Sequence, residues 1–256
     1  MTPEDLHDIS APASDENPLM PGKLAPARCI AGTIGFIVTM VRVDGYLAFC
    51  IIARYLNAAR FTYHVWLCLL RLAHYLVGTI DLPLTLRRAP HGAEMVAYVD
   101  SAHGNVEGGR SQGGFFCCYP GSGALCWSSS APASSADSSS APELHQATRC
   151  AKAVAGLRIL HRELWMPPSH PTITYTDSQV VIDATKSEKV SKESKWVCTR
   201  LAMTRYYQTS GTGTFTHIAG TLNPSDMLTK PLATGPFKEH RAVALGLIPR
   251  APGGSR

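Results

Sequence analysis

The sequence lacks the paired cysteines and the glycine-rich loops that mark several common kinds of site. None of its eight cysteines forms a C-x-x-C pair, although Cys117 and Cys118 are adjacent, and this excludes a zinc ribbon or finger. The spacing also gives no disulfide framework, so we expect reduced thiols and an intracellular protein. The glycines follow no phosphate-loop or dinucleotide-binding pattern.

Long hydrophobic runs are also missing. The longest apolar run, Cys29–Val41, has 13 residues and is closed by Arg28 and Arg42, whereas a membrane-spanning helix needs about 20. The N-terminus carries acidic residues where a signal peptide would be basic. We therefore expect no membrane partner.

The composition is that of an ordinary globular protein. The chain has 256 residues, of which 45% are hydrophobic and 17% charged, so one domain and a smaller remainder are expected. The net charge of +5 permits a polyanionic partner without requiring one.

The order of strand and helix patterns predicts an α/β protein with a mixed five-stranded sheet and helices on both faces. Residues 1–28 are rich in proline and are expected to form a flexible lead-in. A helix is expected over Phe61–Val77, where Gly78 ends the pattern. The later strands and helices are predicted, in order, at Met95–Asp100, Gly114–Tyr119, Ala124–Trp127, Glu143–Leu164, Thr172–Asp177, Ser178–Thr185, Lys195–Tyr207, Thr214–Ala219 and Asn223–Thr229.

Four carboxylates fall at the ends of these predicted elements, namely Asp100, Glu143, Asp177 and Asp226. Grouped carboxylates repel one another unless cations lie between them, and their hard oxygens suit Mg²⁺, which can work in pairs on a phosphodiester. Each residue also has a structural interpretation. Glu143 fits a capping box, Asp226 could complement a helix N-terminus, and the other two could be turn residues.

Residues 95–232 resemble the ribonuclease H domain at the C-terminus of copia-type retrotransposon polyproteins. The most specific match is Asp226–Leu232, which is close to the family's ADILTKPL segment. Upstream, residues 29–90 resemble the end of the reverse transcriptase that precedes this domain. Further matches, in order, are Tyr98–Asp100, Arg110–Phe115, Trp127, Glu143, Tyr175–Gln179 and Ser194–Val197 with Arg200.

This resemblance implies hydrolysis of the RNA strand of RNA–DNA hybrids with two Mg²⁺ ions, for which Mn²⁺ could substitute. It implies that Asp100 bridges both ions and that Glu143 holds one of them near the RNA 2′-hydroxyl. Asp177 would hold the ion that positions the attacking water, and Asp226 would complete its shell. It also implies a C-terminal tail over 233–256, the rest of a retrotransposon polyprotein as a partner, and a place in a cytoplasmic particle or the nucleus.

Two features leave alternatives open. The serine-rich segment Ser128–Ala141 lacks the family's apolar strand residues, and a strand of serine and alanine should pair weakly. A decayed fold that only binds nucleic acid, or a non-functional polyprotein fragment, is therefore the alternative to an enzyme. Four basic residues are candidates for binding hybrid phosphates or for a solvated helix face: Lys192, Lys195, Arg200 and Arg205.

Overall fold

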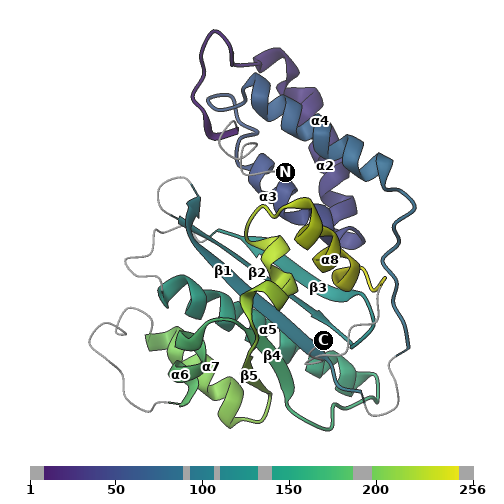
Figure 1. Cartoon of the computed structure of the whole chain (residues 1–256), viewed down its shortest axis with the longest axis vertical. Helices are drawn as coiled ribbons and strands as arrows, with labels where there is room; N and C mark the ends of the chain where they lie inside the picture. The colour runs from purple at the N-terminus through teal and green to yellow at the C-terminus, as the bar shows by residue number, and fades with distance from the viewer. Residues whose placement is uncertain (1–8, 89–92, 107–109, 132–139, 187–197, 248–256) are drawn as a thin grey trace.

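The computed structural model describes residues 9–88, 93–106, 110–131, 140–186 and 198–247. At its centre lies a five-stranded sheet with the strand order β3-β2-β1-β4-β5 (Figure 1). Strands β1 to β3 are antiparallel, whereas β4 is parallel to β1 and β5 is parallel to β4. The predicted mixed sheet is confirmed. Its strands are β1 Val96–Val106, β2 Arg110–Cys118, β3 Ala124–Ser130, β4 Thr172–Thr176 and β5 Gly213–His217.

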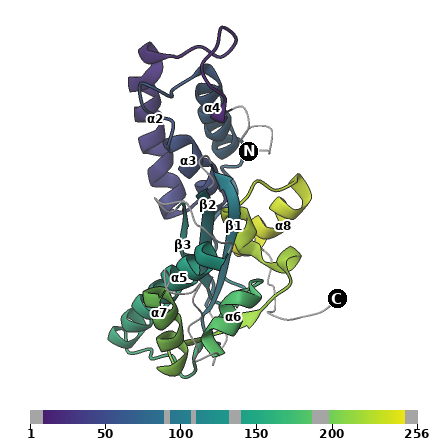
Figure 2. The same cartoon turned by 90° about the vertical axis from the view of Figure 1, so that its left-hand side faces the viewer.

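Helices pack on both faces of this sheet (Figure 2). Alternate residues of β1 point to opposite faces, so Ala97 and Val99 join one core cluster and Val96 and Tyr98 join another. The first cluster includes residues of α5 (Ser140–Glu163), α6 (Gln179–Lys186) and α7 (Cys198–Thr209). The second includes residues of α8 (Thr234–Ala244) and of the 3₁₀ helix η4 (Pro224–Leu228), which follows η3 (Gly220–Leu222).

The serine-rich strand is better paired than its composition predicts. Strand β3 continues through Ser130, and its last residues pair with Gly113, Gly114 and Phe115 of β2. Ser129 is buried, accepts a hydrogen bond from Gln112 Nε2 at 2.6 Å and donates one to the Leu228 carbonyl at 2.6 Å. Polar contacts thus replace apolar burial at the end of this strand. The remainder of the serine-rich segment, residues 132–139, lies outside the described residues.

In the described part of the chain before the sheet lie the helices α2 (Pro21–Met40), α3 (Tyr46–Ala53) and α4 (Tyr63–Gly78), with the 3₁₀ turn η1 (Val43–Gly45) between the first two. Helix α2 begins at Pro21, inside the segment predicted as a flexible lead-in. Proline is favourable at the first helical position because its missing N–H would have no partner there. Ala27, further along α2, is buried in the core of the N-terminal helices. Residues 21–28 are therefore helical and are not part of a flexible lead-in.

Helix α2 also corrects the estimate of apolar length. Among the described residues it is the one helix long and apolar enough to cross a membrane. Its 20 residues begin at Pro21, ahead of the apolar run that starts at Cys29. Four of its residues, Ala27, Ala31, Ile34 and Val38, are buried among the other N-terminal helices. A core helix of a soluble protein and a signal sequence both pass this test of length and composition; this helix lies near the N-terminus, and 22% of its apolar window is buried.

The helices and the sheet share one apolar layer. Val43 of η1 is fully buried with Tyr98 and Phe116 of the sheet, and Trp127 Nε1 donates to the Val38 carbonyl at 3.0 Å. Helix α8 lies in the segment predicted as a tail, and Leu245 directly after it is fully buried in the same layer. Helix α8 therefore covers the sheet face from which η4 approaches, whereas the N-terminal helices stand at one end of the sheet (Figures 1 and 2).

Candidate metal centre

The register between β1 and β4 brings Asp100 and Asp177 together. Tyr98 pairs with Tyr175 in the parallel ladder, and their rings stack with centroids 5.3 Å apart. Asp100 and Asp177 each lie two residues further along, so they reach the same level of the sheet on the same face. The prediction ended the first strand at Asp100, whereas β1 continues to Val106 and Asp100 lies within it, opposite Gly114.

The short helix η4 carries the third aspartate to the same place. Asn223 caps it, accepting from the Ser225 amide at 3.3 Å, and its Nδ2 donates to the Val99 carbonyl of β1 at 3.0 Å. At the other end, Thr229 Oγ1 donates to an oxygen of Asp100. These two links to consecutive residues of β1 fix the position of Asp226 beside Asp100.

Gly114 allows this close approach. A Cβ atom at this position would lie 2.5 Å from Leu228 Cβ, a separation that real side chains do not adopt. Any larger residue at position 114 would therefore move η4 away from β2.

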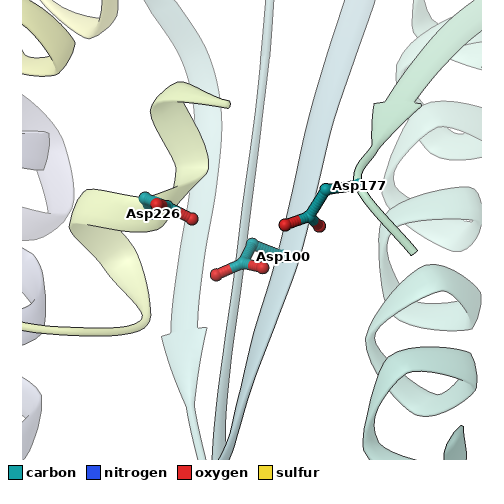
Figure 3. A group of neighbouring side chains, drawn as sticks. All are labelled: Asp100, Asp177 and Asp226. Atoms are coloured by element: carbon teal, nitrogen blue, oxygen red, sulfur yellow. The ribbon is translucent and has the colours of Figure 1, made fainter. Parts of the chain in front are cut away.

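The three carboxylates form one compact group. One oxygen each of Asp100, Asp177 and Asp226 lies within 4.8 Å of the others, and Figure 3 shows the side chains facing a common space from three different elements. Asp100 and Asp226 are buried and Asp177 is half-buried. Lys230 Nζ lies 2.9 Å from Asp226 Oδ2 and supplies one positive charge against three potential negative ones.

Burial and mutual repulsion raise the pKa of two of these groups. Burial and then the charge of Asp100 raise the pKa of Asp226 to about 7. The same two causes, in the same order, raise the pKa of Asp177 above its usual value. The group therefore keeps protons at pH values at which a single exposed carboxylate would be ionised, as expected of a site with too little positive charge.

The group also meets the chemical requirements of a divalent metal site. Asp226 Oδ1 is buried and has no hydrogen-bond partner, which is costly unless a cation or another donor satisfies it. All the available ligands are carboxylate oxygens, the type that Mg²⁺ and Mn²⁺ prefer. The donor set therefore fits a hard divalent cation.

Glu143 lies outside this three-aspartate group. It belongs to the first turn of α5, which packs on the opposite face of the sheet, and its carboxylate accepts a hydrogen bond from Ser178 Oγ. Ser178 follows Asp177 directly, and its hydroxyl also accepts from the Val181 amide at 3.2 Å at the start of α6. The carboxylate of Glu143 thus contacts Ser178, the residue after Asp177. Its assignment as a metal ligand stays a prediction.

The predicted phosphate-binding residues are only partly described. Lys192 and Lys195 lie outside the described residues. Arg200 is half-buried, and Arg205 Nε donates to the Ala184 carbonyl in the last turn of α6 at 3.0 Å. This contact gives Arg205 a packing role between α6 and α7. Binding of nucleic acid by these four residues stays a prediction.

His217 is exposed at the end of β5. It pairs with Thr176, the residue before Asp177.

Sequence reasoning missed the residues that support the three aspartates. Thr229 and Lys230 lie inside the segment that resembles ADILTKPL, and Gly114 lies inside the hairpin match, so the family pattern contained a signal for each. Asn223 could have been found as an N-cap residue before a proline, a common way to begin a helix.

No protein-family model matches the sequence. Among solved structures, the chain is similar to ribonuclease H1 from the halophilic archaeon Halobacterium salinarum, with 16% identity, a TM-score of 0.40, and coverage of 53% of this chain and 93% of that one. It is also similar to LC11-RNase H1 in complex with an RNA/DNA hybrid, with 16% identity, a TM-score of 0.41, and coverage of 53% and 94%.

A third similar structure is the foamy viral protease-reverse transcriptase in complex with an RNA/DNA hybrid. The identity is 12% and the TM-score 0.44, with 91% of this chain covered and 28% of that one. The fold of the present chain is the open mixed α/β sheet described above, and ribonuclease H domains are among its structural neighbours.

Proposed function

We propose that this chain is a divalent-metal-dependent ribonuclease that hydrolyses the RNA strand of RNA–DNA hybrids. The observation that carries the proposal is the convergence of Asp100, Asp177 and Asp226, with a buried Asp226 oxygen left unpaired. The resemblance of residues 95–232 to the copia-type domain supplies the substrate class and suggests an origin in a retrotransposon polyprotein.

The three aspartates would hold the metal ions, with Mg²⁺ as the expected cation, two ions as the expected number and Mn²⁺ as a possible substitute. When bound, such ions activate water and stabilise the leaving oxygen of a phosphodiester. The protein's own contribution is to fix the ligands. Thr229 orients Asp100 through its hydroxyl, and Lys230 holds one oxygen of Asp226.

Glu143 would act from the other side of the sheet. Its contact with Ser178 holds it next to Asp177, and from there it would approach the RNA 2′-hydroxyl, the group that distinguishes RNA from DNA.

One observation favours a second candidate function, a decayed domain that binds hybrids without cleaving them. Glu143 accepts from a serine hydroxyl and does not join the carboxylate group, which leaves three ligands in place of four. The two candidates share the fold and differ in one measurable outcome, the cleavage of RNA.

The test is hydrolysis of a hybrid with a fluorescently labelled RNA strand, in Mg²⁺ and in EDTA. We expect Mg²⁺-dependent products with 3′-hydroxyl and 5′-phosphate ends. Asp100→Asn and Asp177→Asn should each reduce the rate by about 100-fold or more while hybrid binding, followed by fluorescence anisotropy, is retained. A matched control is Asp183→Asn, which removes an exposed carboxylate of α6 outside the group.

Hybrid binding without cleavage in any divalent metal would favour the decayed domain. Cleavage by Asp100→Asn at the rate of the unaltered chain would contradict the metal assignment.

A further inference from the structure

A cavity of about 330 Å³ lies between the N-terminal helices and the segment that runs from η4 into α8. Its volume falls within the range of roughly 300–1,000 Å³ that is typical of small-molecule sites. Its walls are mostly carbon. Apolar lining residues come from both sides, with Leu47, Ala48 and Leu72 on one and Met227, Leu232 and Phe237 on the other.

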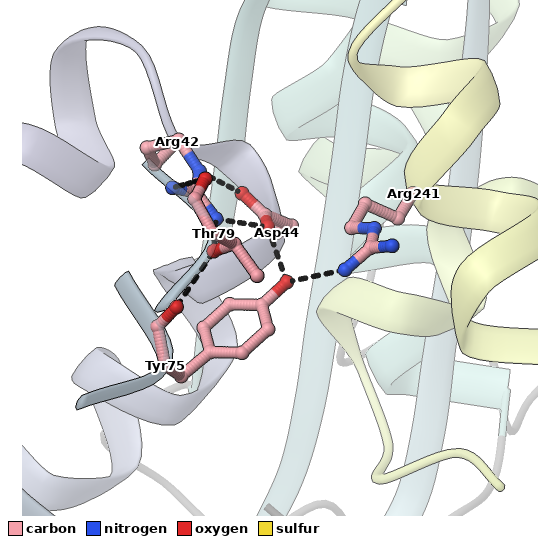
Figure 4. A network of polar contacts seen from close by, with 5 residues as sticks. All are labelled: Arg42, Asp44, Tyr75, Thr79 and Arg241. Carbon is pink, nitrogen blue, oxygen red and sulfur yellow. Dashed lines mark hydrogen bonds and ion pairs between the residues drawn. The ribbon is translucent and has the colours of Figure 1, made fainter. Parts of the chain in front are cut away.

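Among the described residues that line the cavity, Asp44 is the one acidic side chain, and its charge is already matched. Arg42 donates to both of its oxygens at 2.9 and 2.8 Å, and the Tyr75 hydroxyl donates to one of them at 2.5 Å (Figure 4). Arg42 is held in turn by the carbonyl and hydroxyl of Thr79. Asp44 therefore has no charge left for another cation.

Arg241 of α8 stands beside this network with its own charge unmatched. Its Nη1 donates to the Tyr75 hydroxyl oxygen at 3.1 Å, and its buried Nε has no hydrogen-bond partner (Figure 4). Burial, and then the charge of Asp44, raise the pKa of Tyr75 to about 12, so the phenol stays neutral near pH 7. Arg241 thus contacts a neutral oxygen and lacks a counter-ion there.

The lining contains further basic residues. Lys230 is paired with Asp226 of the aspartate group, and the exposed Lys238 lies at the wall of the cavity. The cavity therefore combines a carbon-lined interior with positive charge at its wall.

We propose that this cavity binds a small amphipathic carboxylate, with its apolar body between α3 and η4 and its carboxylate on Arg241. The guanidinium of Arg241 lines the cavity without a carboxylate partner there, so a ligand carboxylate would supply its counter-ion. The carbon lining disfavours a nucleotide, whose sugar and base would lose hydrogen bonds to water at about 1–3 kcal/mol for each unpaired group. The proposal is independent of the proposed cleavage.

The test is titration calorimetry of the full chain with decanoate as the probe and decan-1-ol as its uncharged counterpart. We expect decanoate to bind at least about 10-fold more tightly, since hydrogen bonds to a charged group contribute about 1.5–3 kcal/mol. Arg241→Met should abolish this preference, and Arg241→Lys, which keeps the charge, should retain most of it. Circular dichroism of each variant verifies that the fold is intact.

A second pair of variants tests the place of binding. Ala48→Phe fills the cavity without changing any charge and should eliminate decanoate binding, whereas Ala53→Phe adds the same group at an exposed position of the same helix and should not. Equal affinity for decanoate and decan-1-ol, or unchanged binding in folded Ala48→Phe, would overturn the proposal. Hybrid cleavage can succeed or fail without altering either result.

Discussion

Two buried acidic sites, one in the helical region and one in the sheet region, have opposite environments. Asp44 is nearly inaccessible, and each of its oxygens accepts hydrogen bonds from a cation or a phenol. Asp226 is equally buried, yet it lies beside two other carboxylates and one of its oxygens has no partner. A satisfied buried carboxylate stabilises the fold that surrounds it. An unsatisfied one lowers stability until a ligand completes it.

The neighbouring cations show the same contrast. Arg42 is buried and donates to both oxygens of Asp44, and Thr79 and Tyr75 hold the two groups in place. Lys230 pairs with Asp226 through a side chain that is 41% exposed, so solvent can hydrate its ammonium if the contact is lost. The first pair is therefore a fixed structural element, and the second can rearrange when a ligand binds.

The largest expected effect is a difference in stability between Asp44→Asn and Asp226→Asn. The first leaves the buried Arg42 without its counter-ion and should lower the free energy of unfolding by about 3–5 kcal/mol. The second removes one of three like charges and should leave stability unchanged or raised in metal-free buffer at pH 8. Urea denaturation of both variants measures the difference. Equal losses in the free energy of unfolding would mean that both carboxylates stabilise the fold to the same extent.

The pH dependence of the free energy of unfolding should reflect the raised pKa of Asp226. Because Asp226 has a pKa of about 7 in the folded chain, the folded protein keeps a proton that the unfolded chain loses near 3.8. The resulting stabilisation is complete below the unfolded value and is lost as the pH rises through about 7. Metal-free protein should therefore become less stable between pH 4 and pH 7, with a slope of up to about 1.4 kcal/mol per unit.

Divalent metal should reverse this trend, because it binds the deprotonated carboxylates. We expect Mg²⁺ to raise the melting temperature more at pH 8 than at pH 5, and Asp226→Asn to reduce both the slope and the Mg²⁺ effect. A melting temperature indifferent to Mg²⁺ at every pH would show that the group holds no metal.

A smaller effect should follow from Gly114→Ala. The added methyl group would meet Leu228 and displace η4, with a loss of about 1–3 kcal/mol and a weaker response of the melting temperature to Mg²⁺. Gly156→Ala is the matched control, since nothing lies within 4 Å of its added Cβ inside α5. There alanine should stabilise the helix by about 1 kcal/mol. If Gly114→Ala leaves both the stability and the response to Mg²⁺ unchanged, the position of η4 does not depend on this close approach.

Much of the sheet and the grouping of three aspartates could be predicted because their signals are local. Strands were predicted at Met95–Asp100 and Thr172–Asp177, and Asp100 and Asp177 follow the last paired tyrosines of β1 and β4. Asp226 stands in the segment with the most specific family match. In each case a short stretch of sequence contains both the element and the acidic residue.

The remaining features depend on contacts between distant segments. Ser129 is held by Gln112 and Leu228, so no property of a serine run predicts that β3 continues through it. The pairing of Tyr75 with Asp44 and Arg241 joins residues 31 and 166 positions apart. Such features become visible only when the chain is folded.

The smallest expected effect on stability, and the sharpest on function, belongs to Glu143→Gln. Glutamine keeps the shape of the side chain and can still accept from Ser178, so the free energy of unfolding should fall by at most about 1 kcal/mol. If Glu143 is a metal ligand, the loss of its charge should abolish hybrid cleavage in Mg²⁺ although the protein stays folded. If it only holds the start of α6 against α5, cleavage should continue at nearly the unaltered rate. Measuring urea denaturation and cleavage on the same preparation separates these outcomes, because a structural role links any loss of activity to a loss of stability. A folded, inactive Glu143→Gln would place this residue with Asp226, among the carboxylates that a ligand completes. An active one would place it with Asp44, among those that the fold itself satisfies.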